Sequence, residues 1–400
     1  MLNKMVTFFL LLCSFTVFAQ ATVFSIGEAN KQKSAVFMAQ KTDWEKKLFS
    51  YLSYYREHLD FQSDTSLSKY SYKIEVKENP RQAEIKVEDL LNHKSTNIVV
   101  PNANLRVASH EIIKYILKTS STLFAYNIIV IKNIDKNPKI KELFECDFLG
   151  DNCSRLTFHN GIVIAPSVNK QGDKVLYSVL AKVNNKYAHA LYVYNFSTHK
   201  SELFYENSKL IVGPSFSSDE TGFYYSGFDK KSADIFYMDF SSKIPKKIVE
   251  SSSLDVSPNV VDDLMVFLSD RSGNPMIYLK NLSSSEQPKR ISFVGKFNSF
   301  PQLAHDKKSV VFGSWVDNRF DLYRLNLSNN QIFRLTKNLG SNEEGFFSAD
   351  SNFIYFVSDF KLTNAGNKKL YLIDSWGQYV WPLNLSSTEL KSPRIRKVFN

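Results

Sequence analysis

Histidine, cysteine and carboxylate side chains supply most metal binding and nucleophilic chemistry in proteins. The seven histidines of this chain are scattered, and none stands at metal-ligand spacing from another histidine or a cysteine. His159 and His305 would meet only if the fold brought them into a common channel, and both are expected to be exposed loop residues. Calcium among carbonyl and aspartate oxygens is the one cation that such a channel would suit. The residue types therefore predict no metal site and no cofactor.

Serine chemistry and phosphate binding have no better support. The stretch Gly-Pro-Ser-Phe-Ser at 213–217 lacks the final glycine of a nucleophile elbow. No glycine-rich phosphate loop is present either. Paired carboxylates can be proposed only from geometry, because acidic residues are plentiful throughout. The sequence predicts a protein that is not an enzyme.

The first residues have the pattern of an export signal. Lys4 precedes an apolar run that starts at Met5, and Val17-Phe18-Ala19 suits cleavage after Ala19. No later stretch reaches the roughly 20 apolar residues that a spanning helix needs. Residues 1–19 are therefore predicted to be a signal peptide, and the mature chain is expected to be exported and not membrane-spanning.

Export also bears on the cysteines. Cys13 belongs to the predicted signal peptide, which leaves Cys146 and Cys153 on either side of a predicted hairpin turn. An oxidising compartment permits such a pair to form a disulfide. Two free thiols are the alternative, because the hairpin register decides whether the two Cα atoms come close enough.

The net charge of +10 raises the question of anionic partners. The chain has no block of lysine and arginine and no basic stripe interleaved with aromatic residues, so nucleic acid is not expected as a partner. An acidic protein or an anionic envelope surface fits the charge better.

A unit of about 44 residues repeats along the chain, and each copy begins with an anchor residue followed by a strand pattern. Successive anchors are 48, 44, 43 and 44 residues apart, and each unit continues with an aromatic-centred strand. Four short strands in such a period indicate a β-propeller blade. The anchors are Pro166, Pro214, Pro258, Pro301 and Gly345, and the aromatic residues are Tyr192, Phe236, Tyr278, Tyr323 and Tyr371.

The two ends of the repeat region complete one more unit. Residues 391–399 resemble a first strand with nothing after it, whereas 122–131, 140–148 and 153–158 resemble three strands without a first. Pairing them closes a ring, places Ile395 near Asn127 and removes exposed sheet edges. The predicted fold is mainly β, with a six-bladed propeller over residues 121–400 closed by the C-terminal strand.

Residues 20–120 have a different pattern and predict a small α/β domain. Thr42 and Glu45 form a capping box before an apolar helical face that continues to Leu59. A second helix is expected to begin at Ser109. Strands are expected at 72–78 and 95–100.

This layout resembles the TolB family, the periplasmic propeller component of Tol-Pal systems. The likeness is carried by Ser-Asp-Arg-Ser-Gly-Asn-Pro at 269–275 and by two blade patterns. One has Arg290, Gly295, Asn298 and Pro301, and the other has Arg334-Leu335-Thr336, Gly340 and Asn342. The family's Ser-Pro-Asp-Gly turn is nowhere intact, but Asp219, Asp306 and Asp350 keep its aspartate, which is predicted to bond to the turn backbone.

The resemblance implies a function and two partner sites. A Pal-like peptidoglycan-associated lipoprotein would bind the propeller face formed by loops before the anchors, and a TolA-like inner-membrane protein would bind the segment 20–33. The chain would be a periplasmic monomer acting in outer-membrane integrity, cell division and protein import. The face residues are Val212, Gly213, Val256, Ser257, Ser299, Phe300 and Glu344, and the segment includes Ala21, Thr22, Val23, Phe24, Ser25 and Ile26.

A second class of function stays open at this point. The chain could be a periplasmic propeller that binds or cleaves a glycan or a peptide in its central channel. Converging carboxylates or histidines in the channel would favour that function, whereas stoichiometric binding of an acidic lipoprotein would favour the first.

Overall fold

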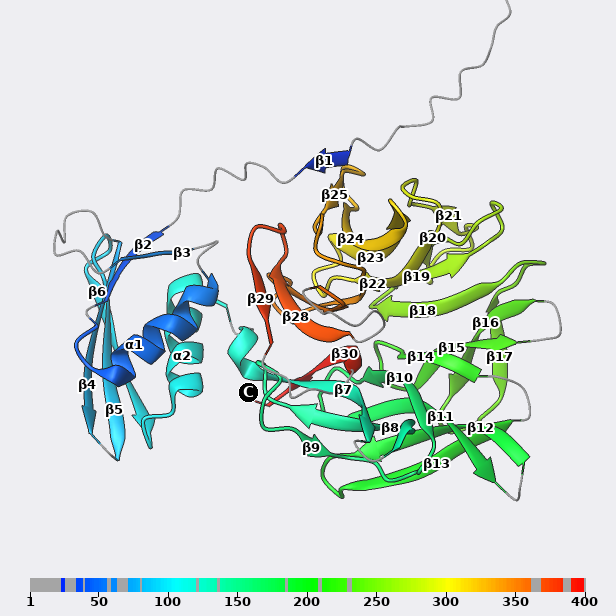
Figure 1. Ribbon diagram of the computed structural model, residues 1–400, viewed down its shortest axis with the longest axis horizontal. Coiled ribbons are helices and arrows are strands. Elements are labelled where there is room, and N and C mark those ends of the chain that lie inside the picture. Colours follow the sequence, from blue (N-terminus) through cyan, green and yellow to red (C-terminus); the bar gives the residue numbers. More distant parts are fainter. Residues whose placement is uncertain are drawn as a thin grey trace, which may run out of the picture.

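The computed structural model describes residues 23–25, 34–38, 40–55, 59–62, 71–79, 81–119, 122–134, 137–183, 186–207, 211–228, 232–360, 368–383 and 390–398. The predicted signal peptide lies outside these residues. Figure 1 shows a small sheet with two helices beside a larger ring of sheets. The chain is mainly β with a small α/β part, so the predicted fold class is confirmed.

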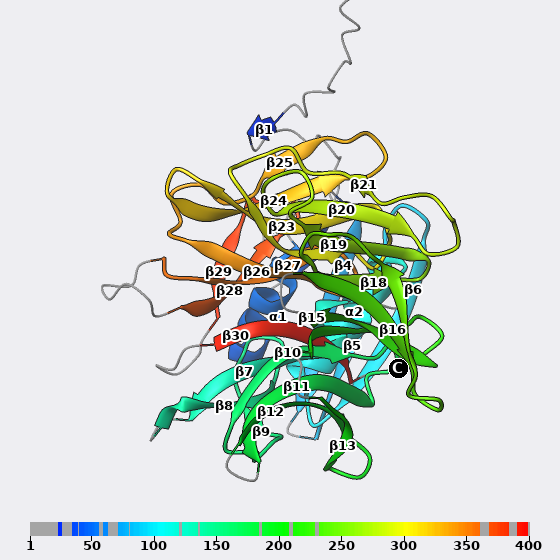
Figure 2. The ribbon, with the colours of Figure 1, turned by 90° about the vertical axis from the view of Figure 1, so that its right-hand side faces the viewer.

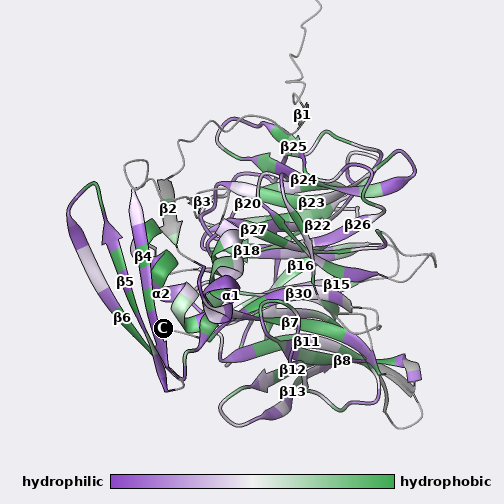
Figure 3. Cartoon of the chain, turned by 60° about the vertical axis from the view of Figure 1, so that its left-hand side comes forward, coloured by the Kyte–Doolittle hydropathy of each residue, from purple (hydrophilic) through white to green (hydrophobic). Residues whose placement is uncertain are grey.

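The α/β part is a five-stranded sheet covered on one face by helices. Strand β2 runs parallel to β3 and β4, whereas β4, β5 and β6 form an antiparallel meander. Ala83, Ile85 and Val87 are buried at alternate positions, which is the pattern of a sheet with one covered face. Figure 3 shows this alternation and the helices between the sheet and the propeller. The strands in spatial order are β3 (Leu59–Gln62), β2 (Ser34–Met38), β4 (Tyr72–Asn79), β5 (Gln82–Asp89) and β6 (Lys94–Pro101).

Helix α1 (Asp43–Leu52) begins with the predicted capping box. The Thr42 hydroxyl accepts from the Glu45 N–H at 3.1 Å, and the Glu45 carboxylate accepts from the Thr42 N–H at 2.7 Å. The predicted continuation to Leu59 is wrong. The helix gives way to a single 3₁₀ turn, η1 (Ser53–Tyr55), and Leu59 starts β3. Packing against the propeller fixes Tyr55, and pairing with β2 fixes the strand.

Helix α2 (Leu105–Leu117) begins four residues before the predicted start. Asn104 caps it, because its side-chain oxygen accepts from the N–H groups of Arg106 at 3.0 Å and Val107 at 3.2 Å. Ser109 lies within the helix, where its hydroxyl donates to the Leu105 carbonyl at 2.8 Å. Asparagine and serine are equally good caps, so cap preference alone does not decide between a helix start at Asn104 and one at Ser109.

The ring contains six blades of four strands each within the described residues. From the innermost strand outward, they are formed as follows. Blade 1 has β30 (Leu390–Lys397), β7 (Tyr126–Ile134), β8 (Asn137–Cys146) and β9 (Ser154–Arg155); blade 2 has β10 (Ile162–Val168), β11 (Lys174–Val183), β12 (Lys186–Asn195) and β13 (Lys200–Asn207); blade 3 has β14 (Ile211–Phe216), β15 (Gly222–Phe228), β16 (Ala233–Asp239) and β17 (Pro245–Val249). Blade 4 has β18 (Asp255–Val261), β19 (Leu264–Ser269), β20 (Met276–Asn281) and β21 (Lys289–Arg290); blade 5 has β22 (Asn298–Leu303), β23 (Ser309–Val316), β24 (Arg319–Asn326) and β25 (Ile332–Arg334); blade 6 has β26 (Asn342–Phe347), β27 (Phe353–Ser358), β28 (Lys369–Asp374) and β29 (Val380–Pro382).

Aromatic pairs join the second and third strands of blades 2 to 6. Phe267 and Tyr278, for example, lie directly opposite each other with ring centroids 5.9 Å apart. Such cross-strand pairs are a main source of sheet stability. The equivalence predicted for the five aromatic residues of the third strands is therefore confirmed. The other pairs are Tyr177–Tyr192, Tyr225–Phe236, Phe312–Tyr323 and Phe356–Tyr371.

The C-terminal strand closes the ring as predicted. Strand β30 pairs antiparallel with β7, which sets Ile395 opposite Ile128 and Arg396 opposite Asn127. Figure 2 shows β30 beside β7, with the sheet of blade 6 on its other side. Closure leaves neither end of the ring with an unpaired inner strand.

The first turn of three blades is held by its aspartate. The carboxylates of Asp219, Asp306 and Asp350 each accept a backbone N–H from two residues ahead, at 3.1, 3.0 and 3.2 Å. The predicted bonding of these aspartates to the turn backbone is confirmed, although the intact Ser-Pro-Asp-Gly sequence is absent.

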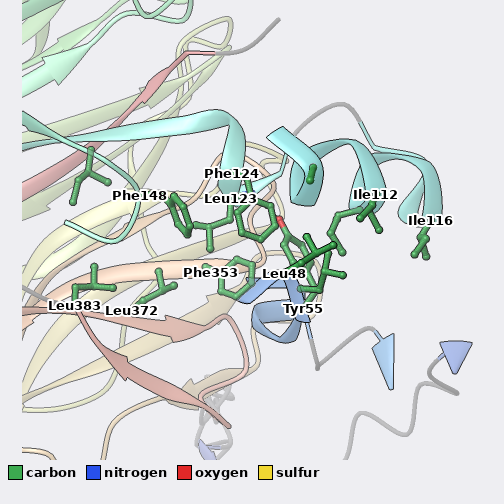
Figure 4. Packing of buried hydrophobic residues seen from close by; sticks show 14 of the residues in the cluster. Leu48, Tyr55, Ile112, Ile116, Leu123, Phe124, Phe148, Phe353, Leu372 and Leu383 are labelled. Atoms are coloured by element: carbon green, nitrogen blue, oxygen red, sulfur yellow. The ribbon is translucent and has the colours of Figure 1, made fainter. Parts of the chain in front are cut away.

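The helices and the propeller share one hydrophobic core, shown in Figure 4. Leu48, Tyr55 and Ile112 come from the helices, and they join Phe148 of blade 1 and Phe353 of blade 6. The Tyr55 and Phe353 rings meet edge to face with centroids 5.1 Å apart. Continuous packing of this kind makes the two parts one unit, held at the end of the propeller that carries the first turns.

Candidate functional site

All six innermost strands carry a β-bulge at the same place. In each, the register shifts around a residue in the left-handed region, with φ between 47° and 64°. Five of these six residues precede a proline, and the sixth precedes Gly345. Left-handed backbone is strained for residues other than glycine and tends to mark functional sites. The six residues are Ala165, Gly213, Ser257, Phe300, Glu344 and Ser392.

These bulges correct the predicted position of the partner face. The seven face residues were expected in loops before the anchors, but they lie within the innermost strands β14, β18, β22 and β26. The reason is that a bulge leaves one residue outside the hydrogen-bond ladder, where a proline without an N–H group fits. An anchor proline therefore marks the middle of a strand here.

A cavity of about 670 Å³ occupies the centre of the ring. It extends from the bulges to the first turns of the blades, where His305 and Lys170 line it. Four of the seven predicted face residues are brought together around it, namely Gly213, Ser257, Phe300 and Glu344. Val212, Val256 and Ser299 are next to them in the chain but are not among the lining residues.

Most of the charged residues that line the cavity are cationic. Arg394 on the closing strand faces it, and burial lowers the pKa of this guanidinium to about 10, with the negative charge of Glu344 acting in the opposite direction. The Glu344 carboxylate accepts from the Ser392 N–H, which links blade 6 to blade 1. Asp262 is paired with Lys307 at 3.2 Å. The lysines and arginine that line the cavity are Lys141, Lys170, Lys391, Arg394 and Lys397, against the acidic residues Asp262 and Glu344.

The two histidines that could have met in a channel have different surroundings. His305 lies in the first turn of blade 5 and lines the cavity, with its ring centroid 6.4 Å from that of Phe346, and part of its surface is accessible to solvent. Desolvation lowers the pKa of His305. His159 lies in the connection between β9 and β10 and is half-buried against blade 2, with its Nε2 atom 2.9 Å from the Tyr177 hydroxyl. Both are loop residues as predicted, but the predicted exposure is wrong for His159.

The N-terminal segment touches the propeller at a distant place. Val23, Phe24 and Ser25 form β1 (Val23–Ser25), which pairs in parallel with β25, the outermost strand of blade 5. Figure 1 shows β1 beside β25 at the edge of the ring. Ala21, Thr22 and Ile26 of the predicted partner segment lie outside the described residues. A backbone pairing of this kind is the way an extended peptide adds to an exposed sheet edge.

Two further features bear on chemistry. Cys146 and Cys153 are joined by a disulfide across the β8–β9 hairpin. No cluster of three or more histidine, cysteine, aspartate or glutamate side chains suited to a metal occurs in the part of the chain that the structure describes. Within the same ranges, no helix has the length and apolar character needed to cross a membrane.

Comparison with known proteins decides the family. A family model described as the TolB beta propeller domain matches residues 117–393. The chain belongs to the TolB family. The match covers the ring of blades and ends at Pro393, within the closing strand.

Curated relatives in the family match the chain over about half of its length. The Tol-Pal system protein TolB of Wolinella succinogenes is 27% identical over 216 residues, which is 50% of each chain. The protein of the same name from Helicobacter pylori is 30% identical over 199 residues, 48% of this chain and 46% of its own. The chain thus spans about half the length of the curated relatives it matches.

A solved structure extends the likeness to the whole fold. TolB from Acinetobacter baumannii superposes with a TM-score of 0.75, covering 93% of this chain and 98% of that one. The sequence identity is 18%, so this match shows the shared fold alone.

The sequence pattern did not single out the cavity residues Arg394 and Phe346, and it predicted His305 only as an exposed loop residue. A signal for two of them existed, because Phe346 and Arg394 both follow directly after the anchor position of their blade. Aligning the residues after the anchors would have revealed one aromatic and one cationic residue among small polar ones.

Proposed function

We propose that this chain is a periplasmic, non-enzymatic interaction protein of a Tol-Pal system. It binds a peptidoglycan-associated lipoprotein over the channel of its propeller and a TolA-like inner-membrane protein through the segment 20–33. Such a protein supports outer-membrane integrity, cell division and the import of proteins that exploit the system. The observation that carries the proposal is the cavity between six strained bulges, in a chain of this family.

The face around the channel has the composition of a binding surface. Connections from the outermost strand of one blade to the innermost strand of the next all lie at the same end of a propeller. At that end Phe158, Leu254 and Phe293 are 69%, 41% and 48% exposed. The guanidinium of Arg155 lies 4.3 Å from the Phe158 ring centroid, and that of Arg290 lies 4.7 Å from the Phe293 ring centroid. Aromatic and arginine side chains are enriched among residues that dominate binding energy.

The α/β part leaves this end uncovered. Its contact with Asp350 is made at the first turn of blade 6, which lies at the opposite end of the ring. Each bulged residue is the third or fourth of its strand, counted from the uncovered end. A partner approaching there would reach the bulges, and Phe300 with 38% of its area exposed, without displacing the helices.

The docked strand β1 supports a two-site mechanism. While residues 23–25 pair with β25, the backbone edge that faces β25 is not available to another protein. Binding over the channel changes the balance between docked and released segment only if the partner prefers one of these states. The coupling is therefore reciprocal, and the inner-membrane partner should alter affinity for the lipoprotein by the same factor.

A substitution within the channel tests the proposal. Gly213 has φ of +64°, and an added Cβ would meet nothing closer than 3.5 Å, so Gly213→Arg directs a long cation into the cavity. The matched control is His199→Arg, at φ of +54° in the exposed turn between β12 and β13, at the opposite end of the ring and outside the cavity lining. Both variants add one cationic side chain at a position with positive φ.

The readout is binding of the purified peptidoglycan-associated lipoprotein encoded in the same genome, measured by calorimetry. We expect Gly213→Arg to weaken binding at least about tenfold and His199→Arg to leave it nearly unchanged. Equal binding by wild type and Gly213→Arg would overturn the proposal.

The cavity itself favours one alternative. About 670 Å³ lies within the range of small-molecule sites, so a glycan or peptide fragment could be the ligand. Cleavage of such a ligand by the wild-type protein, lost in Gly213→Arg, would favour the enzyme over the interaction protein.

A further inference from the structure

The residue after each anchor occupies an equivalent place in the ring, facing the cavity. In blades 2, 3 and 4 this residue ties its blade to the next. Ser167 accepts from the Phe216 N–H at 3.3 Å, and Ser215 accepts from the Val260 N–H at 3.1 Å. Asn259 repeats the contact with the Leu303 N–H at 2.7 Å. Small polar side chains at this place therefore have a structural role.

The next three blades do not use the place in this way. Blade 5 has Gln302, blade 6 has Phe346 and blade 1 has Arg394, and all three line the cavity. Gln302 is 8% exposed, and its side-chain oxygen has no hydrogen-bond partner. Phe346 has no polar side-chain atom, and a guanidinium cannot accept a hydrogen bond. Half of the ring is thus built differently from the other half.

Arg394 is the member of this half with unused bonding capacity. One of its terminal nitrogens donates to the Pro393 carbonyl at 2.7 Å, and its guanidinium carbon lies 4.8 Å from the Phe346 ring centroid. Among the described residues it makes no ion pair, and the nearby carboxylate of Glu344 is bonded to the Ser392 N–H. An arginine has five N–H donors in a planar fork. Arg394 thus has the charge of Glu344 nearby but no ion pair, and a ligand carboxylate would supply that missing contact.

The geometry points to a carboxylate-binding site in the half of the channel formed by Gln302, Phe346 and Arg394. Arg394 receives the carboxylate of a peptide, either an acidic side chain or a C-terminus, and Phe346 supports the apolar atoms next to it. This inference deepens the proposed function, because it names the group that a protein partner would insert.

Two features select a peptide carboxylate over other anions. The fork of a guanidinium matches the two oxygens of a carboxylate, and one arginine suffices for a single charge. The Gln302 side-chain oxygen requires a donor, which the N–H groups of a peptide supply. Inorganic phosphate has neither peptide N–H groups nor the planar pair of oxygens of a carboxylate, so it is the natural control anion.

The experiment uses the whole mature chain and three short peptides, without the lipoprotein. The peptides are Ac-Ala-Ala-Asp-NH₂, its Asn counterpart, and Ac-Ala-Ala-Ala-OH. Ligand-observed NMR measures the dissociation constant for each, with inorganic phosphate as a fourth probe. We expect at least one of the two carboxylates to bind about tenfold more tightly than the Asn peptide and than phosphate. The stronger of the two acids identifies the source as a side chain or a C-terminus.

Variants connect the preference to Arg394. In Arg394→Gln the preference for the acid should disappear, and in Arg394→Lys it should persist in weakened form. Arg81→Gln, in the turn between β4 and β5 and outside the cavity lining, should leave it unchanged. If the role of Arg394 were purely structural, its replacement would lower the melting temperature. If Arg394 binds a ligand and has no ion-pair partner in the free protein, ligand-free Arg394→Gln should melt at the wild-type temperature or above.

Several outcomes would overturn the inference. They are equal binding of the Asp and Asn peptides, tighter binding of phosphate, no binding of any carboxylate up to about 20 mM, or an unchanged preference in Arg394→Gln. The comparison of peptides on the wild-type protein decides the matter even if a variant does not fold. The proposed function could survive such a failure, because the lipoprotein could bind without an inserted carboxylate.

Discussion

The Tyr55 hydroxyl group donates a hydrogen bond of 2.7 Å to the Asp350 carboxylate, although the two residues are 295 positions apart in the chain. The same hydroxyl accepts from the Leu123 N–H at 2.6 Å, and the Tyr55 side chain is fully buried. Burial, followed by the charge of Asp350, raises the pKa of this phenol well above its ordinary value. The hydroxyl therefore stays protonated and joins the helical part to the 3₁₀ turn at 123–125, just before β7, and to the first turn of blade 6.

Replacing Tyr55 with phenylalanine should lower the free energy of unfolding by about 1–3 kcal/mol, because the Leu123 N–H loses its partner inside the core. Urea unfolding of the mature protein measures the change. The matched control is Tyr51→Phe on helix α1, whose hydroxyl makes no hydrogen bond within the described residues. Equal losses in the two variants would show that the Tyr55 hydroxyl contributes nothing beyond its ring.

Removal of residues 20–33 should leave the propeller folded. Strand β25 keeps its antiparallel partner β24, so the free energy of unfolding should change by less than about 0.5 kcal/mol. The backbone amides of Ile332 and Arg334 point away from β24 toward β1 and should exchange with solvent faster, because β1 no longer covers that edge. A chain with the same fourteen residues in shuffled order serves as control. Unchanged exchange at these two amides would argue against the docked strand.

The protein should lose stability as the pH falls from about 7 toward 5. His110 is 3% exposed, its ring bonds to the Thr122 hydroxyl at 2.8 Å, and burial lowers its pKa, opposed by Glu111. An unfolded chain with a histidine pKa near 6.5 binds the proton first, so stabilisation is complete above about pH 6.5 and is lost below it.

The slope approaches about 1.4 kcal/mol per pH unit for each proton taken up on unfolding. Denaturant unfolding at several pH values measures it, and His110→Gln should flatten the decline. Stability that rises on acidification would contradict the assignment of His110 as a buried neutral residue. His159, His189 and His305, whose pKa values are lowered by burial as well, add to the slope.

The repeat revealed the architecture because blades obey local rules. Anchor spacing, the opposed aromatic residues and the strand without neighbours at 391–399 depend on residues close together in the chain or on simple counting. These features predicted the ring and the pairing of Ile395 next to Asn127. Strand β5 was not predicted, because the charged residues of its other face, Glu84, Lys86 and Glu88, alternate with the buried Ala83, Ile85 and Val87.

Features decided by distant contacts could not be predicted in this way. The apolar period through Tyr55 and Leu59 is compatible with a helix, but the core of blade 6 holds Tyr55 and strand β2 holds Leu59. Proline usually marks the end of a strand. Only the structure shows equivalent bulges in all six innermost strands, five of which contain a proline. Arg394 looks like an ordinary basic residue of a tail until closure turns it toward the cavity.

Binding of the protein partner over the channel is tested most directly by light-activated crosslinking in intact cells. The crosslinking residue p-benzoylphenylalanine replaces either Phe300 at the cavity or Leu203 on the outermost strand of blade 2. Both residues are exposed, so both probes are accessible. We predict one dominant adduct with the peptidoglycan-associated lipoprotein from position 300 and none from position 203. Absence of that adduct at position 300, or an equal yield at position 203, would contradict the account.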